Sequence, residues 1–222
     1  MKRILALLLA MLLFAALTGC WPLEEQYTEK PVIYLYPEAE TDVTVRLDYV
    51  GDLTCTYPAY DGAWHVTAAP DGTLTDENGQ TYRYLYWEGV DNVQYDFSEG
   101  FCVPGEETAA FLEDALAQLG LTRAEANEFI IYWLPQMEQN AYNLISFQQE
   151  TYTDAAKLTI TPQPDTLLRV FMAWKPLTSA VEISPQPLTA PERTGFTAVA
   201  TANPNARIFF MFHVSFLSGL PL

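Results

Sequence analysis

The chain has few of the residues and motifs on which most enzymes depend. Its 222 residues include only two histidines, His65 and His213, and three cysteines. Neither histidine has a second ligand two to four residues away, so the spacing of a zinc hydrolase is absent. Serine hydrolases of the Gly-x-Ser-x-Gly type, glycine-rich phosphate loops and dinucleotide fingerprints are also unrepresented. We therefore predict no metal and no cofactor.

Basic residues are scarce as well. Eleven Lys and Arg are outnumbered by 28 Asp and Glu, which gives a formal net charge of −17. Loss of residues 1–19 would remove Lys2 and Arg3 but no acid, and would make the charge −19. A field of that sign repels phosphate backbones and anionic lipid headgroups. We therefore predict no nucleic-acid partner.

The N-terminus has the pattern of a bacterial lipoprotein signal peptide. After Met1-Lys2-Arg3, the segment Ile4–Leu17 is apolar and uncharged over 14 residues, shorter than the roughly 20 residues of a membrane-spanning helix. It ends in Leu17-Thr18-Gly19-Cys20, which resembles a lipobox. The alternative is an ordinary secretory signal followed by a chance cysteine. We predict cleavage before Cys20, lipid on that thiol, and a lipid-anchored, extracytoplasmic position at the cell membrane.

The other two cysteines, Cys55 and Cys102, allow only one disulfide. A compartment outside the cytosol permits such a bridge, but nothing in the sequence brings the two thiols within bonding distance. The bridge and two free thiols therefore both stay open at this stage. A catalytic thiol is disfavoured, because only two histidines exist to activate one.

Most of the chain has the apolar patterns of β-strands. Val32–Tyr36 is an apolar run between two prolines, typical of a buried strand, whereas Asp42–Val50 alternates apolar and polar residues as a half-buried strand does. Turn residues such as Asn78-Gly79 separate the segments. Further strands are predicted at Leu53–Tyr57, Trp64–Ala68, Thr81–Trp87, Asn143–Phe147, Lys157–Thr161 and Leu168–Lys175.

Between residues 106 and 137 the apolar period becomes helical. Gly120 suits the C-terminus of a first helix, and Thr122-Arg123-Ala124-Glu125 is a capping box that opens a second. Pro135 should kink or end that second helix. The order of elements predicts an α+β fold, with an antiparallel β-sheet or small sandwich and an inserted αα-hairpin.

Three segments resemble a family of uncharacterised bacterial lipoproteins and secreted proteins: Lys30-Pro31-Val32-Ile33-Tyr34-Leu35-Tyr36-Pro37, Tyr84-Leu85-Tyr86-Trp87-Glu88-Gly89 and Tyr132-Trp133-Leu134-Pro135. The resemblance covers about residues 30–196 and implies no catalytic residue. Members usually continue after a pair like Gly195-Phe196 into a short Val-Glu-Trp-Gly-Gly segment, from which Thr197 onward departs. An altered reading frame near residue 200 would explain the departure. Sequencing the locus tests that hypothesis, and an intact frame with no nearby alternative would refute it.

Carboxylates are the one abundant reactive group. Glu88, Asp91, Asp96 and Glu99 crowd the end of an aromatic strand, where a pair of acids could cleave a sugar polymer by general acid–base catalysis. A chain with 28 acids also places several in any loop simply to stay soluble, and we favour that interpretation. Calcium is disfavoured because no EF-hand spacing exists. Aromatics such as Trp64, Trp133 and Trp174 fall on apolar faces, which favours core packing over a carbohydrate-stacking platform.

We divide the chain into a signal peptide (1–19), a lipidated tether (20–30), a single α+β domain (31–196) and an atypical hydrophobic tail (197–222). Within the tail, Ile208–Leu222 carries no charge and four phenylalanines, but is short for a membrane span.

The favoured function is a membrane-anchored, non-enzymatic domain that binds a carbohydrate or protein ligand. The alternative is an acid-dependent hydrolase of cell-surface polysaccharide that uses Glu88 and Asp91. The hydrolase predicts a concave pocket holding two carboxylates about 5–10 Å apart. The binding domain predicts a flat or grooved patch of exposed aromatics without such a pair.

Overall fold

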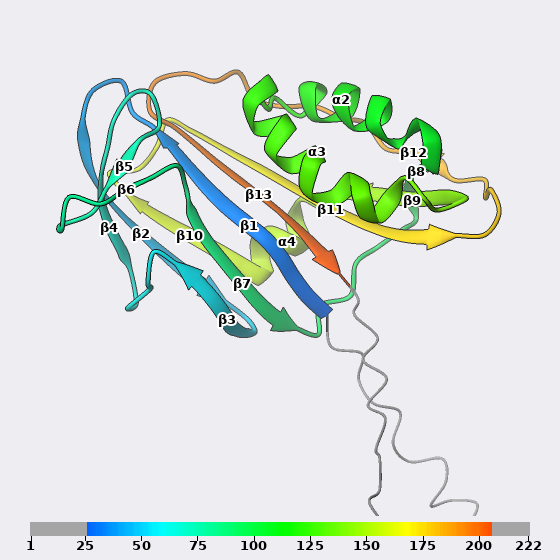
Figure 1. Ribbon diagram of the computed structural model, residues 1–222, viewed down its shortest axis with the longest axis horizontal. Helices are drawn as coiled ribbons and strands as arrows, with labels where there is room; N and C mark the ends of the chain where they lie inside the picture. Colours follow the sequence, from blue (N-terminus) through cyan, green and yellow to red (C-terminus); the bar gives the residue numbers. More distant parts are fainter. Residues whose placement is uncertain (1–25, 206–222) are drawn as a thin grey trace, which may run out of the picture.

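A computed structural model describes residues 26–205, which form three layers (Figure 1). An eight-stranded sheet lies in the middle, two helices cover one of its faces, and a five-stranded sheet covers the other. The chain is mostly β with few helices, as the expected α+β sandwich requires. Among the described residues, no helix is long and apolar enough to cross a membrane.

The large sheet has the strand order β12-β8-β9-β11-β13-β1-β7-β3. Its strands are β1 (Gln26–Tyr36), β3 (Asp52–Tyr57), β7 (Leu85–Asp91), β8 (Glu99–Pro104), β9 (Tyr142–Phe147), β11 (Thr166–Leu177), β12 (Ser184–Pro185) and β13 (Thr197–Asn205). Most neighbours are antiparallel, but β11 with β13 and β12 with β8 are parallel pairs. The sheet is therefore mixed rather than purely antiparallel.

The small sheet is antiparallel, with the order β10-β2-β4-β5-β6. Its strands are β10 (Ala156–Thr161), β2 (Thr41–Tyr49), β4 (Trp64–Ala68), β5 (Leu74–Thr75) and β6 (Thr81–Tyr82). The helical elements are η1 (Gly105–Glu107), α2 (Thr108–Gln118), α3 (Arg123–Met137) and α4 (Glu150–Ala155). Helices α2 and α3 follow each other between β8 and β9 and pack together.

Strand β1 is buried on both faces, which explains the uninterrupted apolar run of residues 32–36. Val32 and Tyr34 belong to the core beneath the helices, whereas Ile33 and Leu35 belong to the core between the two sheets. All four residues are at most 2% exposed. A strand covered on both faces has no polar side to alternate, so the predicted buried strand is confirmed.

The turn between α2 and α3 is built as the sequence predicts. Gly120 has a φ of +83°, a conformation that glycine adopts without steric cost. The Leu121 N–H donates to the Leu116 carbonyl at 3.0 Å, and the Gly120 N–H donates to the Ala117 carbonyl at 3.0 Å. These two bonds make a Schellman motif, which ends α2 at the expected glycine.

Helix α3 begins with the predicted capping box. The Thr122 hydroxyl accepts a bond from the Glu125 N–H at 3.3 Å, and the Glu125 carboxylate accepts one from the Thr122 N–H at 2.7 Å. Pro135 lies inside α3, which continues to Met137 and ends there, within one turn of the proline.

Two of the expected boundaries are wrong. Gln26–Lys30, expected in the tether, are the first residues of β1, and Thr197–Asn205, expected in the tail, form β13 in the middle of the large sheet. The signal of β13 is weak because its inward residues Ala198, Ala200 and Ala202 are small, and alanine has little strand preference. Residues 1–25, with Cys20, and residues 206–222, with the apolar Ile208–Leu222, lie outside the described part.

Candidate functional site

The two carboxylates predicted as a catalytic pair point to opposite faces of β7. Residues of a strand alternate between its faces, so positions 88 and 91 cannot share one. Glu88 follows Tyr84 and Tyr86 on the face toward the helices, whereas Asp91 follows Leu85 and Trp87 on the face toward the small sheet. The structure therefore corrects the predicted pair, because the large sheet separates the two groups.

Asp91 is a buried structural acceptor. Its carboxylate accepts hydrogen bonds from the Tyr49 hydroxyl at 2.5 Å, the Thr28 hydroxyl at 3.3 Å and the Val93 N–H at 2.9 Å. Gly89 makes room for this arrangement, since a Cβ there would lie 2.3 Å from the Tyr49 ring. Burial and the bond to Asp91 raise the pKa of Tyr49, so its hydroxyl stays protonated and donates. Asp91 thus joins β7, β1 and β2.

Glu88 is half-buried and accepts a bond from Tyr86. Burial first, and this bond second, raise the pKa of the Tyr86 phenol. Of the other acids in the predicted cluster, Asp96 is exposed, and its pKa is lowered by bonds from the Ser98 hydroxyl and N–H. These bonds close a turn, so Asp96 serves local structure.

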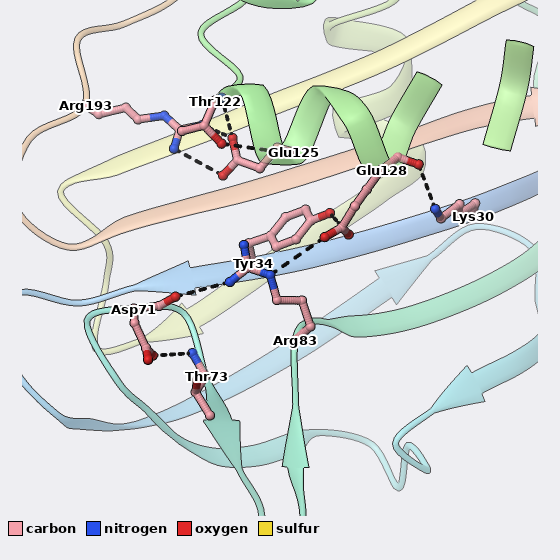
Figure 2. A network of polar contacts seen from close by, with 9 residues as sticks. All are labelled: Lys30, Tyr34, Asp71, Thr73, Arg83, Thr122, Glu125, Glu128 and Arg193. Atoms are coloured by element: carbon pink, nitrogen blue, oxygen red, sulfur yellow. Dashed lines mark hydrogen bonds and ion pairs between the residues drawn. The ribbon is translucent and has the colours of Figure 1, made fainter. Parts of the chain in front are cut away.

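The polar residues of the Lys30–Pro37 segment hold helix α3 on the sheet (Figure 2). Lys30 Nζ donates to the Glu128 carbonyl at 2.9 Å, and the Tyr34 hydroxyl donates to Glu128 Oε2 at 2.7 Å. Arg83 lies 3.8 Å from the other oxygen of that carboxylate. Lys30 has a φ of +49° at a bulge in β1, where the register shifts against both neighbouring strands. The segment therefore has a clear packing role.

Glu125 is the most deeply buried acid of this network. Its side chain is 0% exposed and forms an ion pair with Arg193 at 2.5 Å (Figure 2). Burial alone would raise the pKa of Glu125, but hydrogen bonds from Arg193 and Thr122, with a further bond from Tyr36, outweigh it and leave the pKa below its ordinary value. Glu125 therefore stays ionised and ties three separate segments together.

Arg193 belongs to a long connection between β11 and β13, residues 178–196, which we call the strap. The Arg193 guanidinium also donates to the Gly120 carbonyl at 3.0 Å. In the middle of the strap, the Gln186 amide accepts from the Phe147 N–H at 2.8 Å and donates to the Phe147 carbonyl at 2.6 Å. The Gln186 amide thus bonds the Phe147 backbone at the C-terminal end of β9 as a strand partner would, and the strap is attached at Gln186 and at Arg193.

A hollow of about 650 Å³ lies between the strap, α2 and β8. We call it the β8 slot. Its lining residues are Gly100, Phe101, Cys102, Val103, Phe111, Val181, Glu182, Ile183 and Pro185. The rings of Phe101 and Phe111 lie 4.9 Å apart and also border a second hollow of about 400 Å³ along α2. The β8 slot is therefore mostly apolar, and Glu182 is the one carboxylate that the described part of the chain contributes to it.

The backbone at the bottom of the slot is an open strand edge. On one side β8 pairs with β9 from Phe101 to Pro104, but on the other β12 pairs only with Glu99 and Gly100. The Gly105 N–H continues the β9 ladder by donating to the Ala141 carbonyl. Because backbone groups alternate sides along an antiparallel strand, those of Cys102 point outward. No strand within residues 26–205 pairs with them.

The two described cysteines are free and far apart. Cys55 lies on β3 and Cys102 on β8, which are six strand spacings apart in the large sheet. At about 4.8 Å per spacing the gap is far beyond the roughly 7 Å that a disulfide bridges. The disulfide left open by the sequence is thus excluded in this fold. The structure instead places Cys102 in the slot wall.

His65 and the tryptophans considered in the sequence analysis lie at the surface, in the core or packed against the core. His65 is exposed beside Thr44, and its side chain points away from the face of the buried Trp64 and Val66. Trp64 and Trp133 lie in the core and Trp174 is half-buried. Within residues 26–205, no group of three or more His, Cys, Asp or Glu side chains is arranged to hold a metal ion.

Sequence reasoning missed the slot. Phe101 and Val103 are a short apolar pair behind Gly100, too brief to stand out from the loop before them, and the prolines of the strap indicate only irregular structure. Phe111 lies in the segment of residues 106–137 whose apolar period predicts helix, and it is part of α2. Its contact with Phe101 depends on tertiary packing.

No model of a known protein family matches the chain, and no solved structure is detectably similar to it. The chain is similar to an uncharacterised protein encoded in the bglA 3′ region of Butyrivibrio fibrisolvens, with 46% identity over 84 residues. The matched part covers 35% of this chain and 86% of that protein. The chain therefore belongs to the same family as this Butyrivibrio protein.

Proposed function

We propose that the protein is a lipid-anchored, extracytoplasmic binding protein whose ligand enters the β8 slot. The observation that carries the proposal is an apolar hollow of about 650 Å³ at an open strand edge. Ligand sites are typically concave, mostly apolar and furnished with a few polar groups that fix orientation. Here the polar groups are the outward backbone of Cys102 and the carboxylate of Glu182.

In this proposal, α2 and α3 act as an αα-hairpin inserted between β8 and β9. The hairpin supplies Phe111 as the upper wall of the slot, and the strap supplies Val181 and Ile183 as the outer wall. The buried pair Arg193–Glu125 attaches the strap to α3, and the Gln186–Phe147 bonds attach it to β9. A preformed wall favours binding because little ordering remains to be done when the ligand arrives.

The anchor is tested by replacing Cys20 with serine. Cells that produce the unchanged protein are expected to attach an alkyne-tagged palmitate to it, because the thiol at position 20 carries the lipid. The Cys20→Ser variant is expected to lose the tag, whereas Cys55→Ser, which removes an exposed thiol, should keep it. In-gel fluorescence after tagging measures this. Labelling of the Cys20→Ser variant at the unchanged level would refute the anchor.

The slot is tested through its own thiol. In a Cys55→Ser variant, Cys102 is expected to be the one thiol of the mature protein open to N-ethylmaleimide, since Cys20 would be blocked by lipid. A ligand in the slot covers Cys102 and should slow its alkylation, as followed by mass spectrometry. We would test chitotriose and a short apolar, basic peptide. Protection by either one that is lost in Phe111→Ala supports the proposal, and protection by neither contradicts it.

A further inference from the structure

We infer that the β8 slot takes an extended peptide, which adds to the edge of β8 as a further strand. The inference rests on the proposed function, because it names the kind of ligand that the slot receives. Beyond Gly100, backbone hydrogen-bonding groups of β8 have no strand partner on the side of the slot, among the described residues. The groups of Cys102 that point into the slot are a backbone N–H and a backbone carbonyl, and the natural partner for such a pair is another extended backbone.

The edge already accepts a strand over part of its length. Ser184 and Pro185 pair in parallel with Glu99 and Gly100, and the pairing stops there. The ladder of β8 continues through Cys102 to Pro104 without a partner on that side among the described residues. Pro104 has no N–H, so the open edge ends at that residue. An added strand of four to six residues would thus continue pairing that the strap has begun.

The walls of the slot match the two faces of such a strand. Phe101 and Phe111 lie on the face toward the helices. Cys102 points to the other face, where its sulfur lies 3.4 Å from the Val181 N–H and where Val181 and Ile183 form the strap wall. Side chains of an added strand alternate between these faces. The peptide should therefore carry an apolar residue at every second position toward the two phenylalanines.

The negative charge around the slot favours peptides that carry basic residues. Glu182 borders the β8 slot and Asp114 borders the adjoining hollow, and no Lys, Arg or His of residues 26–205 lines either hollow. The whole chain carries a formal charge of −17. Opposite charges on the two partners favour encounter and correct placement. The partner is therefore an extended peptide with alternating apolar residues and lysine or arginine beside them.

The experiment uses the full mature chain, reconstituted in lipid nanodiscs, with empty nanodiscs as the blank. The probe is a fluorescein-labelled peptide, Lys-Val-Thr-Val-Thr-Val-Lys, whose binding is measured by fluorescence anisotropy. Two further versions carry N-methyl groups on alternate amides, one on the odd set and one on the even set. A strand paired along one edge uses only alternate amides, so one version should bind about tenfold more weakly and the other nearly as well as the parent.

Two protein variants locate the binding. Phe111→Ala removes an apolar wall and should weaken the parent peptide about tenfold. Ile131 lies on α3 and is 70% exposed, so Ile131→Ala should leave binding unchanged. Hydrogen–deuterium exchange of the β8 segment should slow when the parent peptide binds. A Cys102→Ser variant should bind as the unchanged chain does, because the inferred contacts use its backbone.

The outcomes separate this inference from the proposed function. If both N-methylated versions bind like the parent, yet Phe111→Ala still weakens binding, the slot is a binding site but strand addition is overturned. If the peptide does not bind while chitotriose protects Cys102 from alkylation, the inference falls and the proposed function stands. If neither probe interacts, both fall.

Discussion

Replacing Arg193 by alanine is expected to lower the free energy of unfolding by about 3 kcal/mol at pH 7. The Glu125 side chain is 0% exposed, and the variant would leave its charge buried without its partner. The Gly120 carbonyl would lose its bond from the same guanidinium. Urea unfolding followed by tryptophan fluorescence measures the loss. Because Arg193 fixes the strap, the variant should also weaken ligand binding in the slot.

Arg123→Ala is the matched control. Arg123 also forms an ion pair with a glutamate, Glu113, at 2.7 Å, but the two side chains are 66% and 45% exposed. Exposed pairs contribute about 1 kcal/mol or less because water screens the charges. Equal losses for Arg193→Ala and Arg123→Ala would contradict the special role of the buried pair.

Acid should reduce the effect of Arg193→Ala. Glu125 has a lowered pKa in the folded chain, so it adds stability above its ordinary pKa of 4.5 and loses that contribution as the pH falls through the folded value. Without Arg193, burial is the main influence on the pKa of Glu125, which should rise. Protonation of Glu125 then removes the buried unpaired charge that destabilises the variant. The difference between the two proteins should therefore be greatest near pH 7 and shrink as the pH falls from the raised pKa of Glu125 in the variant, above 4.5, to the lowered pKa in the unchanged chain. A difference that grows in acid would contradict this account.

Replacing Asp91 by alanine is expected to lower the free energy of unfolding by about 2–3 kcal/mol. The carboxylate accepts three hydrogen bonds, and its loss leaves the Tyr49 and Thr28 hydroxyls without their acceptor in a buried place. Calorimetric or urea unfolding measures the change. The Tyr49 ring should also become less ordered, because its position against Trp87, 4.9 Å between ring centres, depends on that bond.

Glu88→Ala serves as the control for Asp91→Ala. Glu88 is half-buried and accepts a bond from one phenol, that of Tyr86, so its replacement should cost about 1 kcal/mol or less. Asp91→Asn should lie between the two, since an amide can still accept one bond and donate another. A larger loss for Glu88→Ala than for Asp91→Ala would show that the structural roles are assigned wrongly.

Local patterns in the sequence predicted much of the secondary structure. The alternation of Val43, Val45 and Leu47 placed β2, and the Thr122–Glu125 capping box placed the start of α3. Both depend on interactions between residues close together in the chain, which a single sequence contains. Strand β13 was missed because its alanines carry no local strand signal and fit only where two sheets come close.

The candidate site depended on contacts between distant residues. Glu88 and Asp91 are neighbours in the sequence, yet a strand sends them to opposite faces of a sheet. Phe101 and Phe111 meet because η1 and α2 fold back over β8, and residue 181 reaches Cys102 from the far end of β11. None of these contacts can be predicted from the local sequence pattern.

The amino-acid sequence by itself determined the acidic character, most strands and the two helix ends at Gly120 and Thr122, and it predicts export and lipid attachment at Cys20. Each follows from composition or from the geometry of a few consecutive residues. Only the tertiary structure decided that the strap leaves the edge of β8 open and lines it with apolar side chains. Strand order and the path of a long connection are set by packing over the whole chain, and local preference does not encode them.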